Sequence, residues 1–90
     1  MISRKLILDT MIKHETLTIV DMAKEENLGL VPEMGQLKYL LSSLVNEGFI
    51  ILLYGATPPT YSITERGIEE GKQLALTIEP ENAGDAMTQL

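Results

Sequence analysis

The sequence contains no cysteine among its 90 residues, and aromatic side chains make up only 4% of it. Without cysteine the chain can form neither a disulfide framework nor a thiolate metal site, and it fits a reducing compartment. No apolar run approaches the roughly 18 residues of a membrane span, and no basic start precedes a long apolar stretch. We therefore expect a cytoplasmic protein with no membrane span, whose single core is built from aliphatic residues and methionine.

The side chains that metal and acid–base chemistry require are also scarce. His14 is the only histidine, and its place at a predicted helix end is typical of a surface or capping residue. The pairs Glu25-Glu26 and Glu69-Glu70 are sequence neighbours, and adjacent side chains on a helix diverge. There is no glycine-rich phosphate loop. We therefore expect no enzyme, no metal site and no cofactor.

Positive charge is scarce as well, and the net charge of −6 is unevenly distributed. Residues 1–34 hold four basic and six acidic side chains, and residues 65–90 hold two basic and six acidic ones. Between them, residues 35–64 hold only Lys38 and Glu47. The acidic excess therefore lies outside the central segment, which is itself neutral.

The central segment predicts a helix that turns directly into a hairpin. Within residues 35–47, apolar side chains recur at helical spacing and form one face, made of Leu37, Leu40, Leu41 and Leu44. Gly48 can end this helix in a left-handed conformation. Strong turn residues at 55–59 and a returning strand at 60–63 complete a hairpin over residues 49–63.

The segment before it predicts two helices joined by a short β-prone stretch at residues 16–18. The first helix covers residues 3–14, and its core face holds Ile7, Leu8, Met11 and Ile12. Thr18 is expected to cap a second helix from residue 19 to about residue 27, with Asp21 three residues on in a capping-box-like pair. Gly29 is its expected stop.

The segment after the hairpin predicts a last helix from residue 65 to about residue 76, capped by Thr64. Three apolar side chains are available on it for the core, namely Ile68, Ala75 and Leu76. Residues 79–90 contain Pro80, Gly84 and three acids, and are expected to be a flexible tail.

Two motifs stand out at this spacing. The first is Leu40-Leu41-x-x-Leu44 followed by Glu47-Gly48-Phe49-Ile50, and the second is Tyr61-x-Ile63-Thr64-x-Arg66-Gly67. Together they resemble winged helix-turn-helix transcription regulators of the PadR and MarR kinds, over about residues 6–76. The resemblance implies an α+β winged-helix domain over residues 1–78, with a three-helix core, a two-stranded β wing and a C-terminal helix. Residues 79–90 would be its acidic tail.

The same resemblance implies a transcription regulator that binds double-stranded DNA, with helix 35–47 in the major groove and hairpin 49–63 as wing. The implied DNA-contacting residues are the outward positions of that helix and one arginine after the wing: Gln36, Lys38, Tyr39, Ser42, Ser43 and Arg66. Gln and Ser can hydrogen-bond base edges, and Tyr can contact either a phosphate or a thymine methyl. Arg66 could instead pair with Glu69 or Glu70 along its helix.

A winged-helix module that docks a protein partner is the alternative. The turn at residues 55–59 carries no basic side chain, and the outward face of helix 35–47 is nearly neutral. Phosphate neutralisation by Lys and Arg supplies most non-specific DNA affinity, so such a face also suits a protein surface.

We also expect a homodimer, because one short reading helix offers few contacts to a DNA site. Four apolar residues lie off the core faces assigned above and could form a self-complementary patch: Ile2, Leu6, Leu74 and Ile78. The same four residues could instead pack the terminal helices against each other within one chain.

Overall fold

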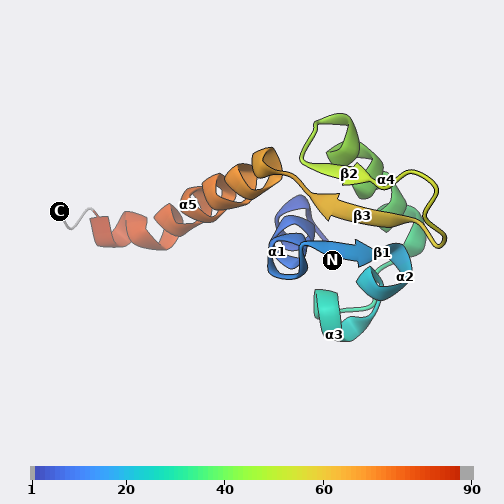
Figure 1. Cartoon of the computed structure of the whole chain (residues 1–90). Helices are drawn as coiled ribbons and strands as arrows, with labels where there is room; N and C mark the ends of the chain where they lie inside the picture. Colours follow the sequence, from blue (N-terminus) through green and yellow to red (C-terminus); the bar gives the residue numbers. More distant parts are fainter. Residues whose placement is uncertain (1, 88–90) are drawn as a thin grey trace.

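The computed structural model describes the backbone of residues 2–87 and the side chains of residues 2–76. Within that part, the chain forms five helices and one three-stranded antiparallel sheet (Figure 1). The elements are α1 (Arg4–His14), β1 (Thr16–Thr18), α2 (Ile19–Met22), α3 (Glu25–Leu28), α4 (Met34–Asn46), β2 (Ile50–Leu52), β3 (Thr60–Ile63) and α5 (Glu65–Met87). The predicted small α+β fold is confirmed at this level.

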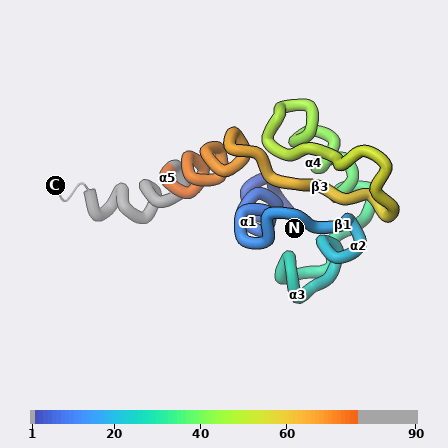
Figure 2. The backbone as a smooth tube through the Cα atoms, in the orientation of Figure 1, coloured from blue at the N-terminus to red at the C-terminus, as the bar shows by residue number. Residues whose placement is uncertain are grey.

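The sheet joins the N-terminal half of the chain to the hairpin. Its strand order is β1-β3-β2, so β3 lies in the middle, with β1 along one edge (Figure 2). Thr16 lies opposite Ser62 on β3, and Ile50 lies opposite Ile63. The β-prone stretch at residues 16–18 is therefore the third strand.

Helix α1 begins and faces the core as predicted. The Ser3 hydroxyl accepts a hydrogen bond from the Leu6 amide at 3.2 Å, which satisfies one of the free N–H groups of the first turn. Ile7, Leu8 and Met11 have no exposed surface. Three of the four residues of the predicted stripe are thus fully buried, whereas the fourth, Ile12, is half-buried.

The single second helix predicted over residues 19–27 is wrong, because the chain forms two short helices there. Thr18 does cap α2, accepting from the Asp21 amide at 3.0 Å. The chain then leaves the helical conformation at Lys24. The Asp21 carbonyl accepts from the Asn27 side chain at 2.6 Å and from the Lys24 amide at 3.1 Å. Asn side chains compete with the helix ladder in this way, which accounts for the break.

Helix α4 and the turn that ends it follow the prediction within a residue. Leu37, Leu41 and Leu44 are fully buried on its core face. Gly48 follows at φ +81°, and its amide donates to the Val45 carbonyl at 3.0 Å, while the Phe49 amide donates to the Leu44 carbonyl at 3.0 Å. This pair of bonds is a Schellman motif, in which a left-handed glycine turns the chain sharply toward β2.

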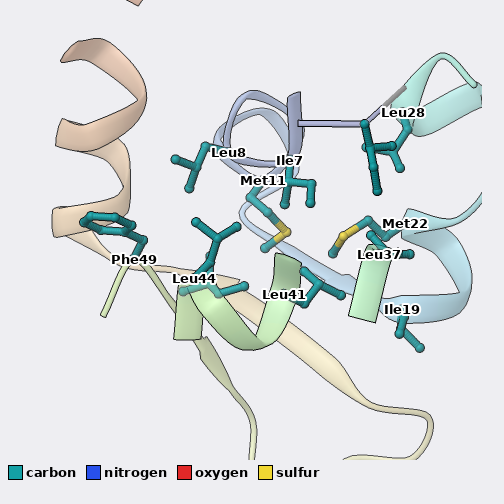
Figure 3. Packing of buried hydrophobic residues seen from close by; sticks show 12 residues of the cluster. Ile7, Leu8, Met11, Ile19, Met22, Leu28, Leu37, Leu41, Leu44 and Phe49 are labelled. Atoms are coloured by element: carbon teal, nitrogen blue, oxygen red, sulfur yellow. The ribbon is translucent and has the colours of Figure 1, made fainter. Parts of the chain in front are cut away.

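The core lies between α1, α2 and α4 (Figure 3). Side chains from these helices meet there, including Met11 of α1 and Met22 of α2, which have no exposed surface. Phe49 packs at the α5 side of this cluster and is 8% exposed. Ile63 of β3 packs against the cluster but is only partly buried, like the other three residues of that strand.

Helix α5 has the predicted cap but a different inner face. Thr64 accepts from the Gly67 amide at 3.0 Å. Gly67 and Gly71 are buried and Leu74 packs on the core, so the row facing inward follows i, i+4, i+7. The predicted core role of Ala75 and Leu76 is therefore wrong, since both are exposed. The helix extends past its predicted end, and the side chains of the predicted tail, residues 79–90, lie outside the described ones.

Three of the four residues expected at a subunit interface pack within one chain. Ile2 is 5% exposed and belongs to the core. Leu6 and Leu74 are partly buried against the same core. The side chain of Ile78 lies outside the described residues. This packing matches the second of the two alternatives for these residues, and the homodimer stays a prediction.

Candidate nucleic-acid interface

The structure brings four of the predicted site residues together on one exposed face of α4. Gln36, Lys38, Tyr39 and Ser42 are all exposed, and Tyr39 is 71% exposed. They are exposed because the leucine stripe of α4 turns the opposite side of the helix into the core. We call these four residues the outward face of α4. It offers one amide, one hydroxyl, one phenol and one ammonium group.

A carboxylate side chain caps the N-terminus of α4. Glu33 is the N-cap residue, and its side chain accepts from the Gly35 amide at 3.1 Å and from the Gln36 amide at 2.7 Å. These N–H groups would otherwise be available to a phosphate, as at many helix N-termini. A contact between α4 and an anionic ligand must therefore come from the side chains of the helix.

Ser43 lies at the margin of the outward face and has a partner within the chain. It is half-buried, and its hydroxyl donates to Glu47 at 3.2 Å. Glu47 in turn accepts from both terminal nitrogens of Arg4, at 2.6 and 2.8 Å. This bidentate pair ties the end of α4 to α1, so Ser43 belongs to a structural contact as much as to the exposed face.

Arg66 does not join the outward face. Its Cζ atom lies 5.5 Å from the centroid of the Phe49 ring, a cation–π distance, and Arg4 lies over the same ring at 5.7 Å. Phe49 follows the end of α4, whereas Gln36 and Lys38 are near its start. At 1.5 Å per residue, the two ends of the helix are roughly 15 Å apart. Within the described part of the chain, Arg66 forms no ion pair with Glu69 or Glu70, so the pairing along its helix that the sequence allowed is not found.

Three of the other basic side chains are occupied by ion pairs within the chain. Lys5 pairs with Asp9 at 2.6 Å, and Lys24 pairs with Asp21 at 3.1 Å. Arg4 is held by Glu47, which raises the pKa of its guanidinium chiefly through their hydrogen bond. Among the side chains that the structure describes, Lys38 has no carboxylate at ion-pair distance. It is thus the cation of the outward face that a ligand can reach.

The β2–β3 hairpin beside α4 presents apolar rather than charged groups. Ile51 and Leu52 are about half exposed, and Tyr54 is fully exposed. The hairpin is held by the Leu53 amide, which donates to the Thr60 carbonyl at 2.8 Å, and the Thr60 hydroxyl, which donates to the Pro58 carbonyl at 2.9 Å. With no basic side chain between residues 49 and 64, the hairpin adds contact area and no cation.

The Arg4–Glu47 pair was not predicted, although part of its signal is in the sequence. Ser43 and Glu47 have the i, i+4 spacing of a helical pair. Arg4, by contrast, is 43 residues from Glu47. Glu33 as the cap of α4 was also missed, because glutamate is not a usual N-cap residue.

We expect Glu47→Gln to make the protein less stable at neutral pH than at acid pH, relative to wild type. The Arg4 guanidinium hydrogen-bonds the charged carboxylate and holds the pKa of Glu47 below its ordinary value of 4.5. A lowered pKa in the folded state adds stability that is complete above the unfolded pKa and is lost as pH falls through the folded pKa. Because the pair is about one-third exposed, the melting temperature should fall by a few degrees or less at pH 7.

Thermal unfolding of wild type and Glu47→Gln at pH 7 and pH 3 measures this difference, with Glu26→Gln as an exposed control on α3. The gap between wild type and Glu47→Gln should shrink at pH 3, because the stability that the charged Glu47 adds is lost as pH falls toward its lowered folded-state pKa. A gap of the same size at both pH values would show that the charge of Glu47 contributes nothing.

Two other kinds of site are not found in the described residues. No group of three His, Asp or Glu side chains in that part is placed to hold a metal ion. No helix there is long and apolar enough to cross a membrane. Comparisons with models of protein families, with curated proteins and with solved structures give no match for this chain.

Proposed function

We propose that the chain is a winged-helix DNA-binding transcription regulator of the cytoplasm, with α4 in the major groove and the β2–β3 hairpin as its wing. The exposed polar side of α4 carries this proposal, because Gln36, Lys38, Tyr39 and Ser42 are all exposed on the helix that contacts β2 of the hairpin. The order helix, strand, helix pair, helix, hairpin, helix and the strand order β1-β3-β2 support the winged helix. No catalytic step is part of the proposal.

Each residue of the outward face has a distinct role in this function. Gln36 and Ser42 carry hydrogen-bonding groups that match base edges in the major groove. Lys38, which has no partner among the described side chains, contacts a backbone phosphate and sets orientation rather than sequence. The start of the helix contributes no amide to a phosphate, because Glu33 already occupies it.

The shortage of cations limits the affinity of one chain. Each phosphate neutralised contributes to non-specific binding, and the exposed cations of the proposed site are Lys38 and Arg66 alone. Two-fold pairing doubles these contacts, so the regulator acts as a homodimer on a two-fold symmetric site.

Substitutions on the outward face separate the two kinds of contact. Lys38→Ala should weaken binding to every duplex and lower the magnitude of the salt slope by about 1, because one phosphate contact is lost. Gln36→Ala should instead change sequence preference. Both residues are exposed, so neither substitution should affect folding.

Fluorescence anisotropy with labelled duplexes at several salt concentrations measures both effects. Lys72→Ala, an exposed lysine on α5, is the matched control and should leave the slope unchanged. If Lys72→Ala lowers the slope as much as Lys38→Ala, or if neither outward-face substitution alters binding, α4 does not contact the DNA.

A protein-docking winged-helix module is the second candidate function, and the hairpin favours it. Ile51, Leu52 and Tyr54 expose apolar surface without a neighbouring cation, which suits a protein partner better than phosphates. The two functions differ in one observation. A docking module shows no binding to duplex DNA at micromolar protein even at low salt, whereas the regulator shows salt-sensitive binding.

A further inference from the structure

Tyr39 is the largest side chain at the centre of the outward face of α4. It lies two residues from Leu37 and from Leu41, both fully buried, and therefore points almost directly away from the core. One turn before it on the same row is Gly35, which has no side chain. The 71% exposed ring is thus the most prominent group that this face can bring to a ligand.

The surroundings of Tyr39 are polar but nearly uncharged. Gln36 and Ser42 lie one turn away on either side, at i−3 and i+3. From Met34 to Asn46 the helix carries Lys38 and no acidic side chain. An aromatic ring flanked by an amide and a hydroxyl can bind a ligand surface that presents one apolar group among hydrogen-bonding groups.

The major-groove edge of an A·T base pair is such a surface. Thymine presents a C5-methyl group there, and adenine presents N7 and the N6 amino group, which Gln pairs with in a bidentate manner. Phosphates line the margins of the groove, so a side chain at the centre of the inserted helix face meets base edges first. Of the two contacts open to Tyr39, the thymine methyl therefore fits its position better than the phosphate.

Building on the DNA-binding function proposed above, we propose that this face reads adjacent A·T base pairs. The Tyr39 ring packs on the 5-methyl group of a thymine, and Gln36 bonds the adenine of a neighbouring base pair. Three residues along a helix rise by about 4.5 Å, close to the ~3.4 Å between stacked base pairs. The inference concerns which base pairs are read, and it rests on α4 being the reading element.

Replacing thymine by uracil tests the methyl contact, because uracil lacks the methyl group and keeps every hydrogen-bonding atom. Duplexes bound by the full chain are first selected from a random-sequence library, and A·T pairs should be enriched at two adjacent positions of the site. Uracil at the contacted thymine should then weaken wild-type binding about fourfold, the effect of one buried methyl group.

Two variants make the test specific for Tyr39. Tyr39→Ala should bind thymine and uracil duplexes equally, whereas Tyr39→Phe should keep the fourfold preference. Lys38→Ala should weaken binding to both duplexes by the same factor. Because Tyr39 is exposed, unchanged thermal unfolding of each variant is expected and shows that the fold is kept.

The possible failures are distinguishable. Selective binding with equal affinity for thymine and uracil at every enriched position overturns the methyl contact and leaves the DNA-binding function intact. A thymine preference that persists in Tyr39→Ala assigns the methyl contact to another residue and overturns the inference. If the chain selects no duplex at all, both the inference and the proposed function fail.

Discussion

Leu41→Ala is expected to lower the free energy of unfolding by about 2–5 kcal/mol, the usual cost of a fully buried leucine truncated to alanine. Leu41 has no exposed surface and lies on the face of α4 that packs against α1 and α2 (Figure 3). The lost methyl groups would leave a cavity in a core that a chain of this size cannot easily rebuild. Urea unfolding followed by circular dichroism gives the change directly.

Leu76→Ala is the matched control for this substitution. Leu76 is 63% exposed on α5, so the same chemical truncation should change the free energy of unfolding by no more than about 0.5 kcal/mol. If the two substitutions cost the same, the described packing of α4 against the core is wrong.

The second large effect is expected from Gly67→Ala, which should destabilise the fold by about 3 kcal/mol. A Cβ atom at position 67 would lie far inside van der Waals contact with the carbonyl oxygen of Phe49. Alanine is otherwise favoured over glycine in a helix by about 1 kcal/mol, so the expected sign is opposite to that of helix propensity. A backbone carbonyl cannot rotate away, and the start of α5 must therefore move off the end of α4.

Alanine substitutions at two other glycines serve as comparisons for Gly67→Ala. At Gly71 the new Cβ would come within 2.5 Å of the Cδ1 atom of Ile12, which is the end of a flexible side chain and can shift. At Gly35 the nearest atoms belong to the exposed Glu33 carboxylate. We expect Gly67→Ala to cost the most, and Gly71→Ala and Gly35→Ala to cost less. A Gly67→Ala protein as stable as wild type would contradict the close approach of α5 to Phe49.

Local signals made much of this fold predictable. Leucines at helical spacing and a following glycine place α4 and its turn, because both the stripe and the left-handed conformation depend on neighbouring residues. The Thr18 and Thr64 caps are equally local. The exposure of Gln36, Lys38, Tyr39 and Ser42 follows from the same stripe.

The features that were missed depend on contacts that spacing alone does not encode. The inner face of α5 is set by where two glycines allow a close approach, so Leu74 packs inward and Leu76 does not. The Arg4–Glu47 pair joins residues far apart in sequence. Arg66 was grouped with the DNA contacts because it follows the hairpin, yet the ring of Phe49 holds it at the other end of α4.

Titration of the intact protein with random-sequence duplex DNA, at low and at moderate salt, tests the DNA-binding function most directly. If Lys38 of α4 contacts the DNA backbone, alone or together with Arg66 of α5, the logarithm of the binding constant should fall with the logarithm of salt concentration. The expected slope is about −1 to −2 per chain, at roughly −0.9 for each phosphate contacted. An absence of binding at micromolar protein and low salt, or binding that does not depend on salt, would contradict the proposed regulator and favour the protein-docking module.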